Sequence, residues 1–118
     1  MKTYCFDIDG TICNNTYGKY DEAVPFEDRI KKINFLYNQG NKIIYFTARG
    51  MGRFDGDVQR VNETFYEFTK QQLDSWGCQY DQIFLGKPSY DYFIDDKAFG
   101  DKDFFDMFYT ITKEGEII

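Results

Sequence analysis

Short apolar runs alternate along this chain with longer stretches in which apolar residues recur every three or four positions. The runs at 3–8, 42–46 and 81–85 have the length and composition of buried strands. The stretches at 25–40 and 58–76 have helical spacing, and each stops at or next to a glycine. Strands that alternate with helices predict a parallel sheet with helices packed on its faces.

Three further segments complete this pattern. Residues 90–94 and 107–112 predict a fourth and a last strand, and a short helix is expected after Asp96. Residues 11–21 hold two asparagines and a glycine between short arms, which is typical of a hairpin or flap. The length, residues 1–118, predicts one domain. We expect an α/β fold, a three-layer Rossmann-like parallel sheet with helices on both faces and a short flap.

The composition limits the chemistry that this domain can perform. The chain has no histidine, which excludes zinc sites built on imidazole and catalysis by Ser–His or Cys–His pairs. Its formal net charge of −6 argues against nucleic acid and anionic membranes as partners. Three cysteines without a CxxC motif fit reduced thiols, and no apolar stretch is long enough to span a membrane. We therefore expect a cytoplasmic protein.

Polar side chains follow the predicted strands, each near the strand's carboxyl end. In chain order they are Asp7, Asp9, Thr47, Lys87, Asp95 and Asp96. The carboxyl ends of parallel strands form the ligand crevice of an open sheet. Four separate segments are therefore expected to deliver polar groups to one edge of this sheet.

These residue types suit phosphoryl transfer. Several carboxylates cannot all stay ionised side by side without a cation, and Mg²⁺ binds a few carboxylate oxygens together with waters and a substrate phosphate. The metal and Lys87 would turn the local field positive, while the hydroxyl and amides at Thr47 and Ala48 would bind further phosphate oxygens. One aspartate can attack phosphorus, and a second can protonate the leaving oxygen and then activate water.

Four motifs, in this order, resemble those of the haloacid dehalogenase superfamily. They are FDIDGTI at 6–12, IYFTAR at 44–49, GKP at 86–88 and FIDDK at 93–97. Together they span most of the chain. The short length and the GKP and IDDKA segments most resemble the capless phosphatases of capsule or polysaccharide biosynthesis.

The resemblance implies catalytic and metal-binding roles for four aspartates. Asp7 would be the nucleophile, forming an aspartyl-phosphate, and its carboxylate would also bind Mg²⁺. Asp9 would be the general acid and base, with its backbone carbonyl on the metal. Asp95 would bind Mg²⁺ directly, and Asp96 would bind it directly or through water.

The resemblance also implies a phosphate-binding set. Thr47 and Lys87 would hold the phosphoryl group, with Gly10 and Ala48 beside them, and Lys87 would orient Asp7. The expected partner is a small phosphorylated metabolite, such as a sugar phosphate in polysaccharide biosynthesis.

The gaps between the motifs leave no room for an inserted cap domain over the substrate. Selection of the substrate would then rest on the flap at 11–21, on the loop at 49–57, or on a neighbouring subunit in a homo-oligomer. Arg49 and Arg53 in this glycine-containing loop are candidate substrate-binding residues. The same loop is equally consistent with a flexible surface segment.

Two other functions remain open from the residues. A receiver domain of a signalling pathway has a similar length, sheet and set of acidic residues, with a Thr and a Lys. In receivers, however, the acidic pair comes first and the Lys last, whereas here DxD comes first and the acidic pair follows Lys87. The other alternative keeps the same fold without hydrolysis. It would be a phosphotransferase, although such enzymes usually need a cap to exclude water, or a non-catalytic binding module.

Overall fold

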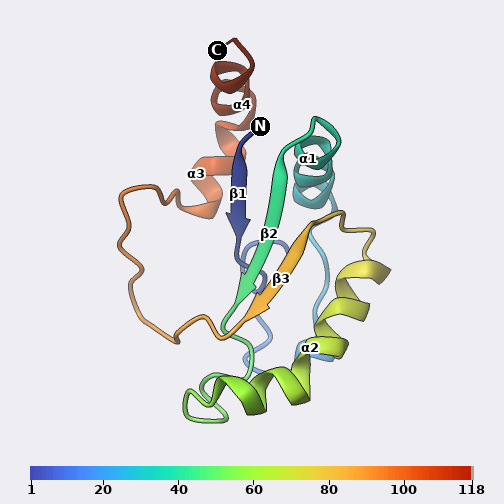
Figure 1. Ribbon diagram of the computed structural model, residues 1–118, viewed down its shortest axis with the longest axis vertical. Helices are drawn as coiled ribbons and strands as arrows, with labels where there is room; N and C mark the ends of the chain where they lie inside the picture. Colours follow the sequence, from blue (N-terminus) through green and yellow to red (C-terminus); the bar gives the residue numbers. More distant parts are fainter. Residues whose placement is uncertain (118) are drawn as a thin grey trace.

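Three parallel strands form the sheet at the centre of the molecule (Figure 1). They are β1 (Thr3–Phe6), β2 (Lys42–Thr47) and β3 (Gln82–Leu85), and their spatial order is the same as their order in the chain. The computed structural model describes residues 1–117 and side chains as far as residue 112. All three strands were predicted from their apolar runs, with small differences at their ends.

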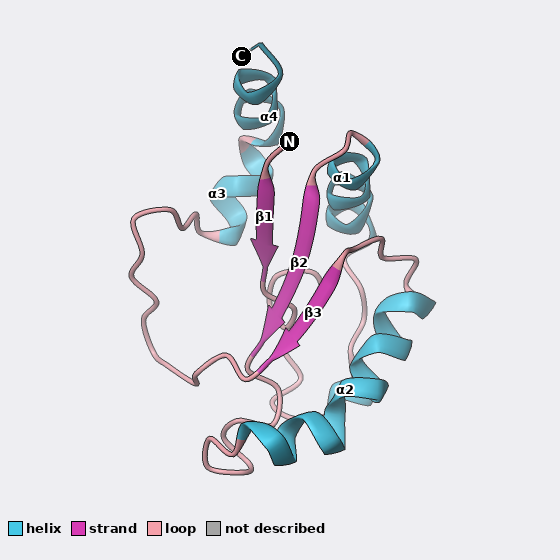
Figure 2. Ribbon diagram, in the orientation of Figure 1, coloured by secondary structure: helices cyan, strands magenta, loops and turns pink. Residues whose placement is uncertain are grey.

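Helices connect and flank these strands (Figure 2). They are α1 (Glu27–Asn38), α2 (Val58–Ser75), α3 (Asp101–Asp106) and α4 (Phe108–Ile117), with a short 3₁₀ helix, η1 (Tyr20–Glu22). The first two were predicted from their helical spacing, and α3 corresponds to the short helix expected after the acidic pair. Helices α1 and α2 each join one strand to the next, while α3 and α4 lie beyond β1.

The core lies mainly on one face of the sheet. Phe6 is its aromatic centre, because its ring packs against Tyr45 of β2 and against Phe104 and Phe105 of α3. Side chains alternate along β2 between buried and partly exposed positions, as expected for a sheet with unequally covered faces. On the less covered face, Phe84 of β3 is 47% exposed.

Two predicted strands are wrong. Residues 90–94 form no strand, and they lie in the irregular connection between β3 and α3. In the segment 107–112, Met107 caps the end of α3 and the remaining residues form the start of α4 instead of a strand. The physical reason is packing: Phe104, Phe108 and Thr112 recur at helical spacing and are all buried, which overrides the strand preference of β-branched and aromatic residues.

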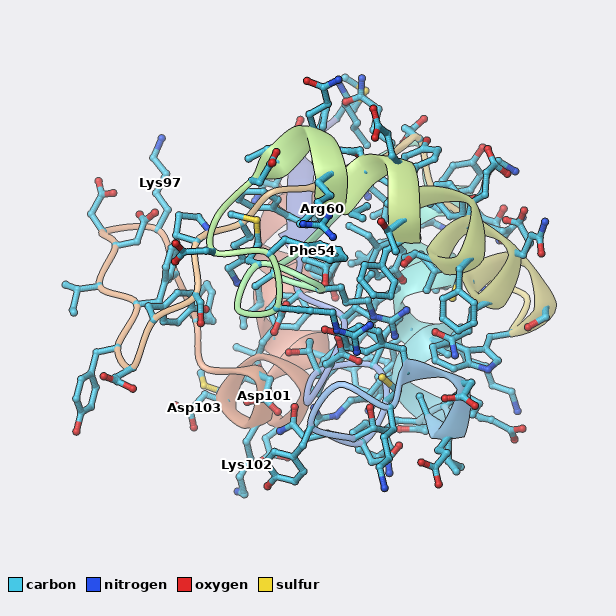
Figure 3. All side chains as sticks on the ribbon, turned by 90° about the horizontal axis from the view of Figure 1, so that it is seen from below. Phe54, Arg60, Lys97, Asp101, Lys102 and Asp103 are labelled. Atoms are coloured by element: carbon cyan, nitrogen blue, oxygen red, sulfur yellow. The ribbon has the colours of Figure 1, made fainter. Side chains whose placement is uncertain are left out.

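Residues 88–99, here called the arm, extend away from the sheet (Figures 1 and 2). The arm carries large apolar side chains into solvent: Tyr92 is 85% exposed and Ile94 is 87% exposed. Figure 3 shows Lys97 pointing outward from the side of the molecule.

Residues 11–21 fold as a series of turns rather than as a hairpin. An isolated antiparallel β-bridge pairs Cys13 of this segment with Pro25. The segment ends in η1, where Tyr20 is held from two sides: its hydroxyl accepts from the N–H of Gly50 at 2.9 Å, and its carbonyl accepts from Gln72 Nε2 at 2.6 Å. These contacts fix the flap against α2 and the loop after β2.

The predicted fold class is confirmed. Helices lie on both sides of the parallel sheet, and residues 1–117 contain no inserted cap domain. Over the same residues, no helix combines the length and apolar character needed to cross a membrane.

Candidate active site

A pocket of about 450 Å³ opens at the carboxyl ends of the three strands. Each strand delivers one polar group to it, since Asp7 follows β1, Thr47 ends β2 and Lys87 follows β3. The flap forms the opposite wall. The lining residues are Asp7, Asp9, Asn15, Thr16, Tyr17, Gly18, Tyr20, Thr47, Ala48, Arg49, Lys87, Pro88, Ser89 and Tyr90.

Asp7 and Lys87 face each other in this pocket. Asp7 Oδ1 lies 3.8 Å from Lys87 Nζ, and the lysine is only 8% exposed. Its ammonium lies 5.1 Å from the ring centres of both Tyr90 and Phe93. Burial raises the pKa of the Asp7 carboxyl above its ordinary value, and the charge of Lys87 and the N–H of Ile8 offset this only in part. The negative charge of ionised Asp7 is therefore only partly balanced by its neighbours, and a further cation would stabilise it.

Asp9 is held by a buried arginine. Arg49 donates from Nε to Asp9 Oδ2 at 2.9 Å and from Nη2 to Asp9 Oδ1 at 3.0 Å, and its side chain is fully buried. The guanidinium also lies 4.7 Å from the ring centre of Tyr20 and donates to Thr69 Oγ1 at 3.4 Å. Two parallel hydrogen bonds fix both the position and the plane of the carboxylate.

Thr47 and Ala48 lie in the pocket, but Gly10 does not line it. Thr47 is 1% exposed, and its Oγ1 accepts a hydrogen bond from the N–H of Arg49 at 3.2 Å, which leaves the hydroxyl proton for another acceptor. The N–H of Gly10 donates to the carbonyl of Cys13 at 2.8 Å. The amide of Gly10 therefore closes the turn after β1 and is not directed to a ligand.

The two candidate substrate-binding arginines have different environments. Arg49 is buried and paired with Asp9, and it lines the main pocket beside that carboxylate. Arg53 lies outside the main pocket, beside a smaller hollow of about 270 Å³ that adjoins it at Gly18 and Tyr20. There Arg53 lies 5.2 Å from the ring centre of Phe65.

Asp95 and Asp96 do not reach the pocket in this structure. Both are exposed on the arm, and the N–H of Lys97 donates to Asp95 Oδ1 at 2.9 Å, which helps to hold the pKa of Asp95 below its usual range. Among the side chains that the structure describes, residues 1–112, no three potential ligands of the types Cys, Asp and Glu gather as a metal site. The four-carboxylate set implied by the motifs is thus split, with Asp7 and Asp9 in the pocket and the other pair outside it.

Part of the pocket wall could not be predicted from the sequence. Asn15, Thr16 and Ser89 line it, although neither spacing nor motif distinguishes them. The buried Oγ1 of Thr16 has no hydrogen-bond partner within the described part of the chain. A hydroxyl left unpaired beside a pocket is available to a polar ligand.

No protein-family model matches the sequence, and no curated protein matches it either. Among solved structures, a structural-genomics target from Vibrio cholerae is similar over almost the whole chain. It has 28% sequence identity and a TM-score of 0.83, covering 97% of this chain and 99% of its own. This similarity shows that the fold over almost all of the given residues recurs in a crystal structure.

Two larger structures share the central fold. A D,D-heptose 1,7-bisphosphate phosphatase from B. bronchiseptica, solved with magnesium and phosphate, has 20% identity and a TM-score of 0.50. It covers 72% of this chain and 49% of its own. The Pnkp1/Rnl/Hen1 complex has 20% identity and a TM-score of 0.54, covering 88% of this chain and 33% of its own. The chain therefore has a haloacid dehalogenase-like fold, in a form without a cap domain.

Proposed function

We propose that this protein is a magnesium-dependent phosphomonoesterase that acts through an aspartyl-phosphate on Asp7. The observation that carries the proposal is the meeting of Asp7 and Lys87, 3.8 Å apart, with Asp9 and Thr47 in one pocket. A carboxylate nucleophile, a cation for phosphate oxygens and a second carboxylate for proton transfer are the groups that phosphoester hydrolysis requires.

The first step would transfer the phosphoryl group to the protein. An oxygen of the Asp7 carboxylate attacks phosphorus, and the bond between phosphorus and the ester oxygen breaks. Lys87 and the Thr47 hydroxyl stabilise the negative charge on the other phosphate oxygens. Asp9 delivers a proton to the departing alkoxide, which leaves as an alcohol.

The second step would release phosphate. Asp9, now ionised, takes a proton from a water molecule, whose oxygen attacks the phosphorus of the aspartyl-phosphate. The acyl–phosphate bond breaks, so that Asp7 regains its carboxylate and inorganic phosphate leaves. Arg49 would keep Asp9 in place through both steps, because each carboxylate oxygen retains a lone pair beyond the one facing the guanidinium.

The residues in the pocket fit a magnesium ion. Mg²⁺ is commonly held by one or two carboxylates, substrate phosphate and waters. Asp7 supplies a partly buried carboxylate, and a bound cation would stabilise its ionised form, because burial raises its pKa more than the charge of Lys87 lowers it. The backbone carbonyl of Asp9 would be a second donor. When bound, the ion supplies positive charge to the phosphate oxygens. We propose Asp95 and Asp96 as further ligands, and their route to the pocket is argued in the next subsection.

The pocket supports a small substrate. A volume of about 450 Å³ lies within the usual range for metabolite sites and would accommodate a phosphorylated sugar. One protein with this fold is a heptose bisphosphate phosphatase. By analogy of fold alone, this supports a sugar phosphate as the substrate here. We propose a sugar phosphate of polysaccharide biosynthesis as the substrate and, because all three cysteines are free thiols, a cytoplasmic location.

The direct test is release of phosphate from a panel of sugar phosphates and p-nitrophenyl phosphate, with magnesium and with excess EDTA. We expect many turnovers per chain with magnesium, and a loss of at least about a hundredfold with EDTA. Absence of turnover with every ester would contradict the proposal. Stable phosphorylation by acetyl phosphate, without release, would instead favour the receiver-like alternative.

Arg49→Met tests the clamp on Asp9. We expect kcat/KM to fall about a hundredfold on an alkyl phosphate, whose leaving group needs a proton, and less than about tenfold on p-nitrophenyl phosphate, whose leaving anion is stable. A merely structural role would lower both rates equally, and that result would contradict the clamp.

Two variants serve as controls for this comparison. Arg60→Met removes an exposed arginine that packs on Phe54 at 4.4 Å, well outside the pocket, and should keep both rates (Figure 3). Arg49→Lys retains a buried positive charge but cannot form the two parallel hydrogen bonds, so it separates loss of charge from loss of positioning.

A further inference from the structure

The arm exposes an apolar surface that a folded chain normally buries. Tyr92 and Ile94 are more than four-fifths exposed, and Phe93 and Phe99 are more than half exposed. Exposed apolar side chains of this size usually mark a contact surface when they are close together. Asp95 and Asp96 directly follow the run at 92–94, so whatever covers that run also determines where these two carboxylates lie.

The sheet offers an unused edge. In the spatial order β1-β2-β3, β1 pairs on one side with β2, and within residues 1–117 no strand pairs with its other side. An unpaired strand edge presents backbone N–H and C=O groups that readily accept an additional strand. The apolar run at 92–94 has the β-rich character of such a strand.

The arm is poorly connected for pairing in parallel with β1 of its own chain. It leaves the carboxyl end of β3 and runs outward and back toward α3, opposite in direction to β1 (Figure 1). A parallel crossover generally needs about a dozen residues or more, whereas only residues 86–91 separate β3 from Tyr92. The arm of a second copy could pair in parallel with this β1, because no connection within one chain limits its position.

The similarity to a crystal structure reaches over the arm. The Vibrio cholerae crystal structure matches 97% of it with a TM-score of 0.83, and coverage of that extent includes most or all of the arm. An extended arm with an apolar run is typical of proteins that exchange a segment between two identical chains.

We propose that two copies of this chain form a dimer in which the arm of each copy pairs in parallel with the free edge of β1 in the other. Parallel pairing would carry Asp95 and Asp96 to the carboxyl end of the partner's sheet, which is where Asp7 lies in each chain. Each active site would then combine Asp7 of one copy with Asp95 of the other. The sharing of the site rests on the proposed function, whereas the dimer does not.

Light scattering of the purified chain tests the dimer without any assay of activity. We expect about twice the 14.0 kDa chain mass at micromolar concentration. Ile94→Asp should give the monomer, because it places a charge in the proposed contact, while Val24→Asp, at an exposed apolar position outside the arm, should leave the dimer intact. A monomeric wild type, or a dimer that Ile94→Asp does not weaken, would overturn the proposal.

Complementation tests the shared site. Asp7→Asn and Asp95→Asn, each inactive alone, are refolded together in equal amounts. A mixed dimer has one site with both wild-type aspartates, so random pairing should restore about a quarter of wild-type activity. No recovery, or full activity of Asp95→Asn alone, would overturn the shared site. If the wild type hydrolyses no ester, the proposed function fails, while the light-scattering result still decides the dimer.

Discussion

Replacement of Asp7 by asparagine should abolish turnover, lowering kcat by at least about a thousandfold. An amide oxygen is a poor nucleophile toward phosphorus, and no other carboxylate in the pocket is placed to substitute, because Asp9 is clamped by Arg49. Phosphate release under saturating substrate and magnesium measures the effect. Residual activity above about a tenth of the wild-type rate would remove Asp7 from the role of nucleophile.

The same variant should be more stable than the wild type when no metal is present. Burial raises the pKa of Asp7 in the folded state, so ionised Asp7 lowers the stability of the folded protein at neutral pH. Asparagine removes that charge. The gain in the free energy of unfolding should be complete at pH values above the pKa of Asp7 in the folded protein. It should disappear as the pH falls below 3.8, the ordinary pKa of an aspartate. Thermal melts in EDTA from pH 3 to 7 test this, and a variant less stable than the wild type at pH 7 would contradict it.

Replacement of Lys87 by methionine should lower kcat/KM by about a hundredfold to a thousandfold. The buried ammonium of Lys87 lies 3.8 Å from Asp7 Oδ1, and it would compensate the charge of both the nucleophile and the transferring phosphoryl group. Inorganic phosphate should also inhibit the variant more weakly than the wild type, since the product carries the same oxygens. Steady-state kinetics with phosphate as inhibitor measures both effects.

A matched control separates this effect from a general loss of positive charge. Lys102→Met removes a lysine whose side chain is 80% exposed and that pairs with Asp106, one turn along α3 (Figure 3). Exposed pairs of this kind contribute little, so the control should retain wild-type kinetics. Equal losses in the two variants would mean that Lys87 acts through the overall charge and not through contact with phosphate.

Most of the fold could be predicted from the sequence, because the patterns that indicate its strands and helices are local. The strands β1, β2 and β3 are short apolar runs, and α2 carries apolar residues at helical spacing up to Gly77. The wrong strand at 107–112 arose because its β-branched and aromatic residues favour a strand when considered alone. Phe104, Phe108 and Thr112 repeat at helical spacing across the boundary of that segment, and this longer pattern was the available signal.

The site was accessible only in part. The order of the motifs and the parallel sheet suffice to place Asp7, Asp9, Thr47 and Lys87 at one edge, and the structure brings these four together. The pairing of Arg49 with Asp9 could not be predicted, because it depends on the path of the loop after β2. The separation of Asp95 from the pocket could not be predicted either, because it depends on the path of the arm. The apolar run of the arm has the pattern of a strand, but within residues 1–117 it pairs with no strand of the sheet.

The buried pairing of Asp9 with Arg49 has a consequence for inherited variation. Arg49 rests on Thr69 of α2 and on the ring of Tyr20, while a Cβ at Gly50 would lie 2.7 Å from Phe65. The chemistry of the pocket is thus tied to residues inside the core. If every residue were substituted in turn, loss of activity would extend from the pocket through Arg49 to Thr69 of α2. Well-folded but inactive variants would then arise at positions that never contact a substrate.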